Sequence, residues 1–410
     1  MKRLSLFALI LIFCIISASS QSCLPGNNNF ILQSQIDNFQ ASNPGCTEIE
    51  GDIDIFDDDI TNLNGFSVLT SIAGSLSIKW ANSLVDLSGL ENITSIGGDL
   101  YIGVLSTWKQ GGNDSLINLD GLSGLKSIGG NLYIGFNASL TSIEGLSNLT
   151  SIGGSLEIEG NASMPNLNGL ENLTSIPGNL EIGDFGGWKT QSCYGNPLLL
   201  NLDGLSGIDN VGGYLSIECN DMLMSLEGLE NLMSISGYLN IGTIDVSPWG
   251  TLIAGNPNLT TLSGIDNIAS NSIDSLNIIG NDSLTNCEVH SICDYLISLG
   301  GIANIHDNSP GCNSQQEVQD SCIANSVNIN EQIIIDHLIL YPNPAIQELN
   351  ITVEGLALDE VAIYTVTGQR VLQKKPANGS VDISHLQAGM YIVEVSVENR
   401  KVRQKLLVQR

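Results

Sequence analysis

The fold of this chain is decided by a repeating unit, of which SIGGSLEIEGNASMPNLNGLENLT (residues 151–174) is a plain copy. Apolar residues alternate through its first part and then recur at every third position from Met164 to Leu173. Alternation is typical of a strand with one buried face, and short apolar runs broken by Gly and Asn are typical of tight bends. The pattern therefore predicts a strand followed by several bends, which is one coil of a solenoid.

The unit recurs along the chain with a basic period of 24 residues, lengthened to 32, 35 and 37 residues by three extra loops. The leucine that opens each strand stands at Leu76, Leu100, Leu132, Leu156, Leu180, Leu215 and Leu239, with variants at Ile53 and Leu276. About seven apolar side chains per coil contribute roughly 10–20 kcal/mol, whereas ordering the backbone costs roughly 24–48 kcal/mol. A single coil is therefore unstable, and we expect nine stacked coils that fold together.

An asparagine follows eight of the nine strands by a few residues. These asparagines are Asn82, Asn113, Asn137, Asn161, Asn196, Asn220, Asn256 and Asn281. Asparagine tolerates tight turns and bonds to neighbouring backbone, so we interpret the set as a stacked ladder that holds the bends.

Two of the units, LSNLTSIGG (146–154) and LENLTSI (170–176), resemble the receptor L domain, the leucine-rich β-helix of insulin- and epidermal-growth-factor-type receptors. The resemblance covers about residues 46–286 and implies a right-handed β-helix, or leucine-rich solenoid, that binds ligands and does no chemistry. The cysteine-rich and kinase parts of such receptors have no counterpart here, so receptor signalling does not carry over.

The first 20 residues predict an export signal. Lys2 and Arg3 precede a mostly apolar run from Leu4 to Ile16, followed by small residues up to Ser20. This order is typical of a cleaved secretory signal, with a membrane anchor as the alternative. No later segment is long and apolar enough for a membrane span, so we expect none in the mature chain.

Cysteines are expected to form disulfides in an exported chain. Beyond the signal they are Cys23, Cys46, Cys193, Cys219, Cys287, Cys293, Cys312 and Cys322. Cys193 and Cys219 both stand just before the ladder asparagine of adjacent coils, where a spacing of about 5 Å suits a bond between them.

Both ends of the solenoid need covers, because open coils expose apolar surface and strand edges. We expect small helical caps stapled by disulfides at residues 21–50 and 287–322, around the solenoid at 51–286. Their apolar residues stand at helix-like spacing: Phe30, Ile31, Ile36 and Phe39 in the first, and Val289, Ile292, Tyr295, Leu296 and Leu299 in the second. The pairing of the last four cysteines stays open.

Charge is spread unevenly. Residues 21–337 contain 36 acidic residues and only four basic ones, Lys79, Lys109, Lys126 and Lys189, for a net charge of −32, whereas the remaining tail carries +1. A surface this negative repels nucleic acid and favours cations or basic partners, so nucleic-acid binding is excluded.

The tail changes pattern. Residues 323–337 are interpreted as a linker, and residues 338–410 show simple alternation divided by turn glycines, which predicts a small antiparallel β-sandwich. YPNP (341–344), YTVTGQRV (364–371) and LQAGMYIV (386–393), with a basic last strand, resemble the type A C-terminal sorting domain of the type IX secretion system. The residues that carry this resemblance are Tyr341, Pro342, Asn343, Pro344, Gly368, Gly389, Tyr391, Lys401, Arg403 and Lys405. The resemblance implies recognition by that secretion machinery and location outside a Bacteroidetes-type cell, either released or on the outer-membrane surface.

All four tryptophans stand at one phase of the repeat. Trp80 follows a strand, and Trp108, Trp188 and Trp249 lie in the extra loops at 103–112, 183–195 and 242–255. Three of the four have a lysine neighbour: Lys79, Lys109 and Lys189. Aromatic faces stack on sugar rings and an ammonium binds a carboxylate or sulfate, so these residues predict a binding edge for an acidic polysaccharide or a surface protein. Packing of each Trp within its own loop is the alternative.

We therefore expect an adhesin or glycan-recognition module, with a passive display or coat protein as the alternative. A polysaccharide-degrading β-helix enzyme is less favoured, because residues 21–337 contain no Arg and only three His. No catalytic constellation is evident and no cofactor is expected. Five aspartates at 52–59 could hold calcium, but they fit no calcium-loop motif and are better interpreted as a solvated rim.

Overall fold

The computed structural model describes residues 21–104, 112–185, 193–247, 250–298, 300–301, 303–324, 338–353, 358–366, 368–375, 379–397 and 400–410. The chain forms two units, residues 1–319 and 320–410. We call the described part of the first unit the repeat region, and residues 338–410 the tail domain. Each is described by itself.

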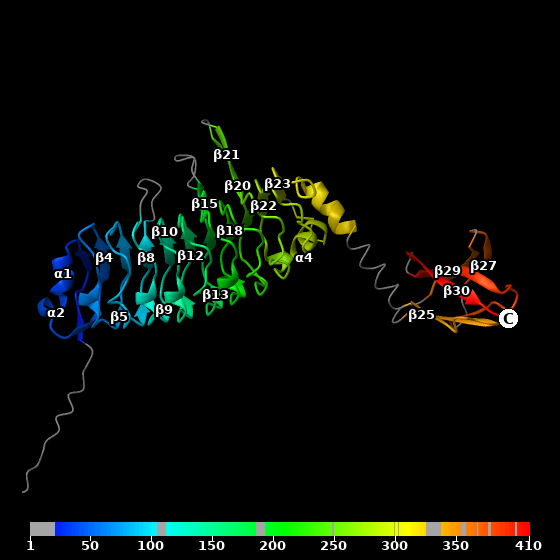
Figure 1. The fold of residues 1–410 in the computed structure, drawn as a ribbon, viewed down its shortest axis with the longest axis horizontal. Helices are drawn as coiled ribbons and strands as arrows, with labels where there is room; N and C mark the ends of the chain where they lie inside the picture. The colour runs from blue at the N-terminus through cyan, green and yellow to red at the C-terminus, as the bar shows by residue number, and fades with distance from the viewer. Residues whose placement is uncertain are drawn as a thin grey trace, which may run out of the picture. The chain divides into compact units, whose positions relative to one another are not determined.

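A long parallel sheet runs through the repeat region, and its strands are hydrogen-bonded in chain order (Figure 1). Within the described residues it has 11 strands: β2 (Asn27–Phe30), β4 (Asp52–Phe56), β6 (Leu76–Lys79), β8 (Leu100–Gly103), β10 (Leu132–Gly135), β12 (Leu156–Glu159), β14 (Leu180–Ile182), β18 (Leu215–Ile217), β19 (Leu239–Ile241), β22 (Leu276–Ile279) and β23 (Ala303–His306). Nine of these are the strands of the repeat. The other two, β2 and β23, belong to the predicted caps, so the sheet continues into both of them.

Constant register explains why the sheet forms. Leu156 pairs with Leu132 on one side and with Leu180 on the other, and all three side chains are buried. Because side chains alternate along a strand, every residue between two buried positions points outward. Equal spacing of the repeat therefore produces rows of like residues along the sheet.

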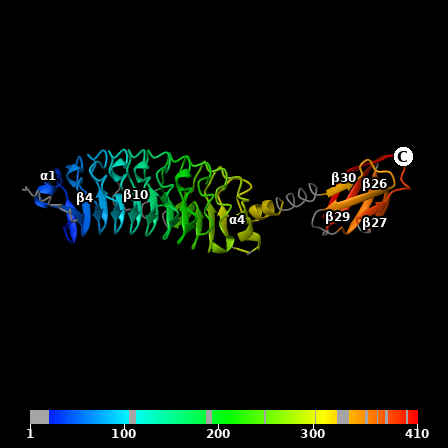
Figure 2. The ribbon, with the colours of Figure 1, turned by 90° about the horizontal axis from the view of Figure 1, so that it is seen from below.

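A second parallel sheet of short strands lies across the core, in residues 21–152. It consists of β1 (Gln21–Cys23), β3 (Cys46–Ile49), β5 (Ser71–Ile72), β7 (Ser95–Ile96), β9 (Ser127–Ile128) and β11 (Ser151–Ile152), and β13 (Ser175–Ile176) pairs with β17 (Asn210–Val211) further along. Single 3-10 turns precede several of these strands: η1 (Asn64–Phe66), η2 (Asp120–Leu122), η3 (Glu144–Leu146) and η4 (Asp203–Leu205), with η5 (Ser270–Ser272) near the end. Parallel sheets in constant register are consistent with a β-helix or solenoid (Figure 2).

Eight fully or almost fully buried asparagines form a ladder beside the 11-stranded sheet. They are Asn113, Asn137, Asn161, Asn196, Asn220, Asn256, Asn281 and Asn308. The side chain of Asn196 donates to Ile158 O at 2.9 Å and to Asn220 Oδ1 at 3.2 Å, and its Oδ1 accepts the backbone N–H of Asn161 at 3.3 Å. Each amide thereby satisfies buried backbone groups of its neighbours, which would otherwise cost about 1–3 kcal/mol each.

The prediction that Asn82 is the first member of the ladder is wrong. Asn82 is only half-buried and accepts the N–H of Asp114, whereas the ladder position in that repeat is held by Ala81, whose N–H donates to Asn113 Oδ1. At the other end Asn308 extends the ladder into the cap, where it donates to Ile278 O at 2.7 Å.

The N-terminal cap contains α1 (Gln33–Asp37) and α2 (Phe39–Ser42). Ile36 and Phe39 are buried, and the Phe39 ring packs edge-on against Phe66 with centroids 5.0 Å apart. Two residues differ from the helical expectation: Phe30 lies in strand β2, and Ile31 is 39% exposed. Cys23 is bonded to Cys46, which joins β1 to β3.

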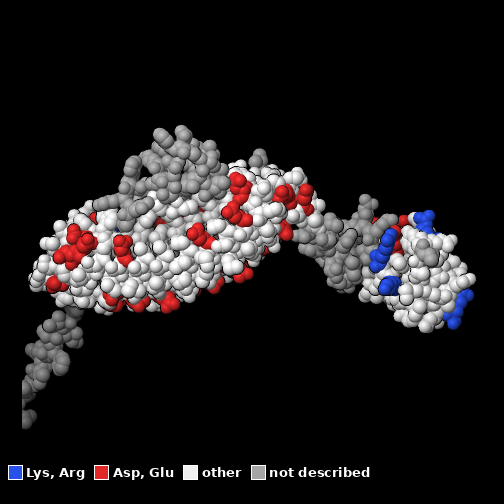
Figure 3. Space-filling model, turned by 45° about the horizontal axis from the view of Figure 1, so that its top comes forward, with Lys and Arg blue, Asp and Glu red and all other residues white. Residues whose placement is uncertain are grey.

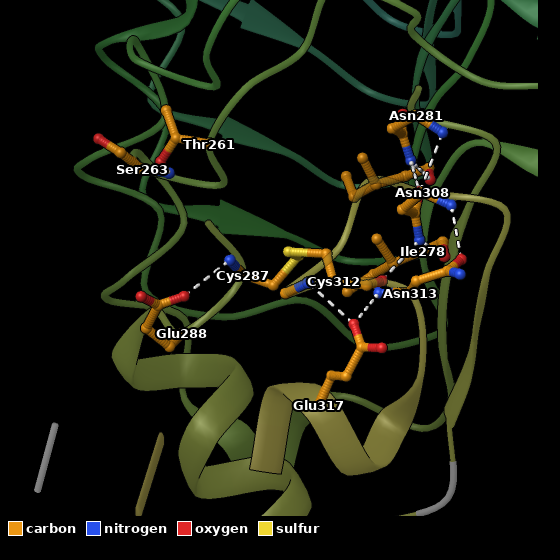
Figure 4. The surroundings of a disulfide bond; sticks show 12 residues. Thr261, Ser263, Ile278, Asn281, Cys287, Glu288, Asn308, Cys312, Asn313 and Glu317 are labelled. Carbon is orange, nitrogen blue, oxygen red and sulfur yellow. Dashed lines mark hydrogen bonds between the residues drawn. A yellow bond between two sulfur atoms is a disulfide. The ribbon is translucent and has the colours of Figure 1, made fainter. Parts of the chain in front are cut away.

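The C-terminal cap contains α4 (His290–Cys293), a π-helical turn η6 (Asp294–Ser298) and a helix over residues 315–324. Val289, Ile292, Tyr295 and Leu296 are buried, and Leu299 lies outside the described residues. Cys287 is bonded to Cys312, while Cys293 and Cys322 are also disulfide-bonded. Beside the Cys287–Cys312 bond, Glu317 accepts the N–H groups of Gly311 and Asn313 at 2.8 and 3.0 Å (Figure 4). The helix continues through residue 324, two residues into the segment interpreted as a linker.

The tail domain consists of two antiparallel sheets within its described residues. One contains β24 (Leu338–Tyr341), β25 (Glu348–Val353) and β28 (Ser380–Asp382), and the other contains β27 (Arg370–Lys374), β26 (Glu360–Thr365), β29 (Gly389–Val397) and β30 (Arg400–Val408). Both sheets contribute to one buried apolar cluster, which includes Ile351, Ile363, Val393 and Leu406.

Candidate binding edge

A row of tight bends follows the 11-stranded sheet and forms one edge of the repeat region. In most repeats the residue two positions after the last inward-facing isoleucine of the strand has a positive φ, as at Trp80 (52°), Phe136 (58°) and Cys219 (61°). Adjacent members are hydrogen-bonded: Trp80 N–H donates to Gly112 O, and Cys219 N–H donates to Gly255 O, both at 3.1 Å. We call this row the bend edge.

The three extra loops begin and end at glycines on the bend edge. Gly103, Gly183 and Gly242, where they begin, have φ of 105°, 78° and 78°. Only glycine fits where the second loop returns to the bend edge, because a β carbon on Gly195 would lie 1.5 Å from Cys219 O. Strands β15 (Asp184–Phe185) and β16 (Cys193–Tyr194) pair at the base of the second loop, and β20 (Thr243–Ser247) and β21 (Gly250–Ala254) form the third (Figure 1). The described parts of these loops project from the same edge.

A hollow of about 480 Å³ lies at the bend edge beside the second loop. Its lining comprises Phe136, Gly160, Ala162, Cys193, Tyr194, Gly195, Pro197, Cys219 and Asp221. The rings of Phe136 and Tyr194 meet edge-to-face with centroids 5.1 Å apart. Asp221 is exposed and supplies a carboxylate among apolar walls. Such a mixture can hold an apolar ring face while bonding a polar group.

The Cys193–Cys219 disulfide forms part of the hollow wall, and its Cα atoms are 5.6 Å apart. It joins the base of the second loop to the bend of the next repeat. The bond therefore holds the hollow and the loop base together.

Tyrosines and carboxylates gather on the outward face of the sheet next to the hollow. The hydroxyl of Tyr133 donates to Glu159 at 2.7 Å and contacts Val104 O. Tyr214 bonds to Glu181, and the ring of Tyr214 stacks on Tyr238 with centroids 4.1 Å apart. The register of the sheet brings these residues together, because it aligns the outward positions of neighbouring repeats along and just before the strands.

The carboxyls of this face are held partly protonated near neutral pH. Burial raises the pKa of Glu159 to about 8, and the negative charge of Asp184 adds to the effect. Burial likewise raises the pKa of Glu157 to about 7, with the charge of Glu181 second. Glu218 is 6% exposed, and burial raises its pKa to about 7 although Ser216 donates to it at 2.7 Å. Neutral carboxyls and phenols can each donate and accept hydrogen bonds, as hydroxyl-rich ligands require.

Among the predicted binding residues, Trp80 and Lys79 are the two that the structure describes. Trp80 is half-buried at the bend edge rather than within a loop. The ammonium of Lys79 lies 2.9 Å from Asp54 Oδ1, so it already has a carboxylate partner. Trp108, Lys109, Trp188, Lys189 and Trp249 lie outside the described residues.

Sequence reasoning did not identify the outward Tyr/Glu face or the Phe136–Tyr194 hollow. The signal was present, because Tyr101, Tyr133, Glu157 and Glu181 each directly follow the strand leucine of consecutive repeats. The hollow left no such signal, since its two rings come from repeats that are not adjacent in sequence.

The surface carries acidic groups over the repeat region, whereas the basic groups visible in Figure 3 gather on the tail domain. Within the described part of the chain, no group of three or more His, Cys, Asp or Glu side chains is arranged to hold a metal ion. Among the residues that the structure describes, no helix has the length and apolar character needed to cross a membrane.

Comparison with known proteins identifies the tail. Residues 339–409 match the family described as secretion system C-terminal sorting domain, which confirms a type IX secretion sorting domain at this end of the chain. The domain indicates interaction with the secretion machinery and a secreted or cell-surface protein of a Bacteroidetes-type bacterium.

A curated relative is ulvan lyase NLR42 from Nonlabens ulvanivorans, which is 29% identical over 72 residues. These residues are 17% of this chain and 14% of the relative, so the chain spans only a small part of that protein's length. The aligned length is close to that of the sorting domain.

Proposed function

We propose that this protein is a secreted or surface-displayed recognition module, an adhesin or glycan-binding protein, whose ligand contacts the bend edge. The repeat region would be a right-handed β-helix of the receptor L-domain type that displays this edge. One observation carries the proposal: the bases of the loops, the aromatic-lined hollow and the face rich in hydroxyl and carboxyl groups lie together at one edge.

The described residues favour a neutral, hydroxyl-rich glycan over an acidic one. Lys79 is engaged by Asp54, and the carboxyls beside the hollow have raised pKa values rather than basic partners. An acidic polysaccharide would meet carboxylates that repel it, whereas sugar hydroxyls would find donors and acceptors at Glu159, Tyr214 and Asp221. Phe136 and Tyr194 supply apolar ring surface for a sugar face.

Binding without catalysis is part of this proposal. A lyase acting on an acidic glycan needs a base and a positive group that neutralises the substrate carboxylate, and residues 21–337 contain no Arg and only four Lys, of which Lys79 is engaged by Asp54. The ulvan lyase match supports no chemistry here, because its aligned length is about that of an export domain.

A glycan array with the full chain tests the proposal. We expect selective binding that is weakened in Phe136→Ala and lost when all four Trp are replaced by Ala, with the exposed Val85→Ala as a matched control. An unchanged profile in both variants would refute the bend edge as the site. Absence of any ligand for the wild type, with retention at the cell surface, would support passive display instead. Release of new sugar ends during incubation would show an enzyme.

A further inference from the structure

Two adjacent repeats carry apolar residues at two outward positions of the bend, the first of which is Ser or Asn in the other repeats, whereas the second is apolar in some of them, as at Val85 and Ile117. The second and fourth residues after the ladder asparagine are Leu198 and Leu200 in one repeat, and Met222 and Met224 in the next. Their exposed fractions are 49%, 49%, 43% and 59%. We call these four residues the Leu/Met patch.

The internal repeat shows that the fold does not require apolar residues at these positions. The flanking repeats place Ser163 and Pro165 before the patch and Asn258 and Thr260 after it, and further repeats use Ser139 with Thr141 and Ser283 with Thr285. The two patch repeats stack directly, since Asn196 N–H donates to Asn220 Oδ1 at 3.1 Å. The fourth position also bonds to the repeats on either side, because Leu200 N–H donates to Pro165 O and Thr260 N–H donates to Met224 O, both at 3.0 Å. Neighbouring repeats are spaced about 4.8 Å apart, as paired strands are. The four side chains therefore form one contiguous apolar surface rather than scattered residues.

Acidic residues border the patch on both sides. Asp221 precedes Met222 at the hollow, and Asp203 and Glu227, both exposed, follow on the other side. No Lys or Arg occurs from residue 190 to residue 369 to balance them. A second copy of this chain would bring the same negative rim against it, which disfavours self-association.

We propose that the Leu/Met patch docks a partner protein through an amphipathic segment whose apolar side chains are flanked by Lys or Arg. Exposed Met side chains adapt to varied apolar partners, and a row of apolar residues with an acidic border suits a basic amphipathic helix with apolar anchors at i, i+3 or i+4, and i+7. The site lies beside the proposed glycan edge and shares only Asp221 with it. It would remain if the glycan proposal failed.

Three labelled synthetic helices of equal length test this proposal against the full chain by fluorescence anisotropy. The first has a Leu face and Lys flanks, the second has Glu in place of Lys, and the third has the first composition in a scrambled order without an apolar face. We expect saturable binding of the first alone. The variant Met222→Ser/Met224→Thr, which copies Ser283 and Thr285 of a later repeat, should weaken that binding about tenfold or more.

Controls separate the patch from general charge attraction. Val85→Thr, at the fourth position of an earlier repeat, should leave binding unchanged, and thermal unfolding should show that both variants fold. Equal binding by wild type and the Met222/Met224 variant, or binding of the Glu helix as strongly as the Lys helix, would overturn the proposal. If light scattering showed concentration-dependent dimers that disappear in the variant, the occupant of the patch would be a second copy of this chain and the proposed basic partner would be wrong. If the Met222/Met224 variant bound the glycan array as the wild type does, the two sites would be separate.

Discussion

The repeat region and the tail domain solve the problem of a stable β structure in opposite ways. The repeat region stacks parallel strands, buries a row of asparagine amides and contains disulfides, while carrying a large negative charge. The tail domain packs two antiparallel sheets around one apolar cluster, contains no cysteine and is nearly neutral in charge. The repeat region therefore depends on contacts between neighbouring repeats, so local damage should spread along the stack.

Breaking the asparagine ladder should have the largest effect. Asn196→Ala removes the partner of Ile158 O and of the Asn161 N–H, both buried, so we expect a loss of about 3–5 kcal/mol in the unfolding free energy. Chemical denaturation followed by circular dichroism measures it. The exposed Asn148, which makes one side-chain bond to Ser123 O, is the matched control, and Asn148→Ala should cost about 1 kcal/mol or less. Equal losses in the two variants would contradict a structural role for the ladder.

Removing the disulfide at the hollow should have the next largest effect. The double variant Cys193→Ser/Cys219→Ser opens a bond with a sequence separation of 26 residues, so we expect a loss of about 3 kcal/mol. Hydrogen exchange should rise most at the backbone amides near Tyr194 and Cys219. Protection unchanged at these amides would show that the bond does not hold the hollow.

The stability of the repeat region should depend on pH. Glu159, Glu157 and Glu218 have raised pKa values in the folded chain, so the folded state binds more protons than the unfolded state. The stability that these groups contribute is complete below about pH 4.5 and is lost as pH rises to about 8. We expect Glu159→Gln to reduce this loss by about 2 kcal/mol in thermal unfolding between pH 5 and pH 8. The exposed Glu144→Gln is the control, and an equal slope in both variants would contradict the assignment.

A tail substitution should have the smallest effect and should stay within its unit. Arg403 lies 2.6 Å from the buried carboxylate of Glu394, but its own side chain is 68% exposed. Arg403→Ala should lower the stability of the tail domain by about 1 kcal/mol and leave the unfolding of the repeat region unchanged. Differential scanning calorimetry resolves the two transitions, with the exposed Lys405→Ala as control. A shift of the repeat-region transition would show that the two units are coupled.

The repeat, the strand positions and the phase of the bends follow from the amino-acid pattern alone. Periodic leucines require a buried row, and Cys193 and Cys219 share a phase that puts them within bonding distance once repeats stack. The sorting domain was also evident, because its motifs lie in a short, ordered segment. The helix-like spacing of Phe30 and Ile31 predicted a helix there, and this prediction is wrong. Strand pairing with β4 outweighs local periodicity at the end of a sheet.

The role of each row of residues depends on how the repeats pack in three dimensions. It placed Ala81 rather than Asn82 in the ladder, because backbone position at the bend, not residue type, sets the row. It brought Phe136 and Tyr194 together across an intervening repeat, and it placed half-buried Glu159 and buried Glu218 beside other carboxylates. These properties depend on distances between repeats and on exclusion of water, neither of which a linear pattern contains.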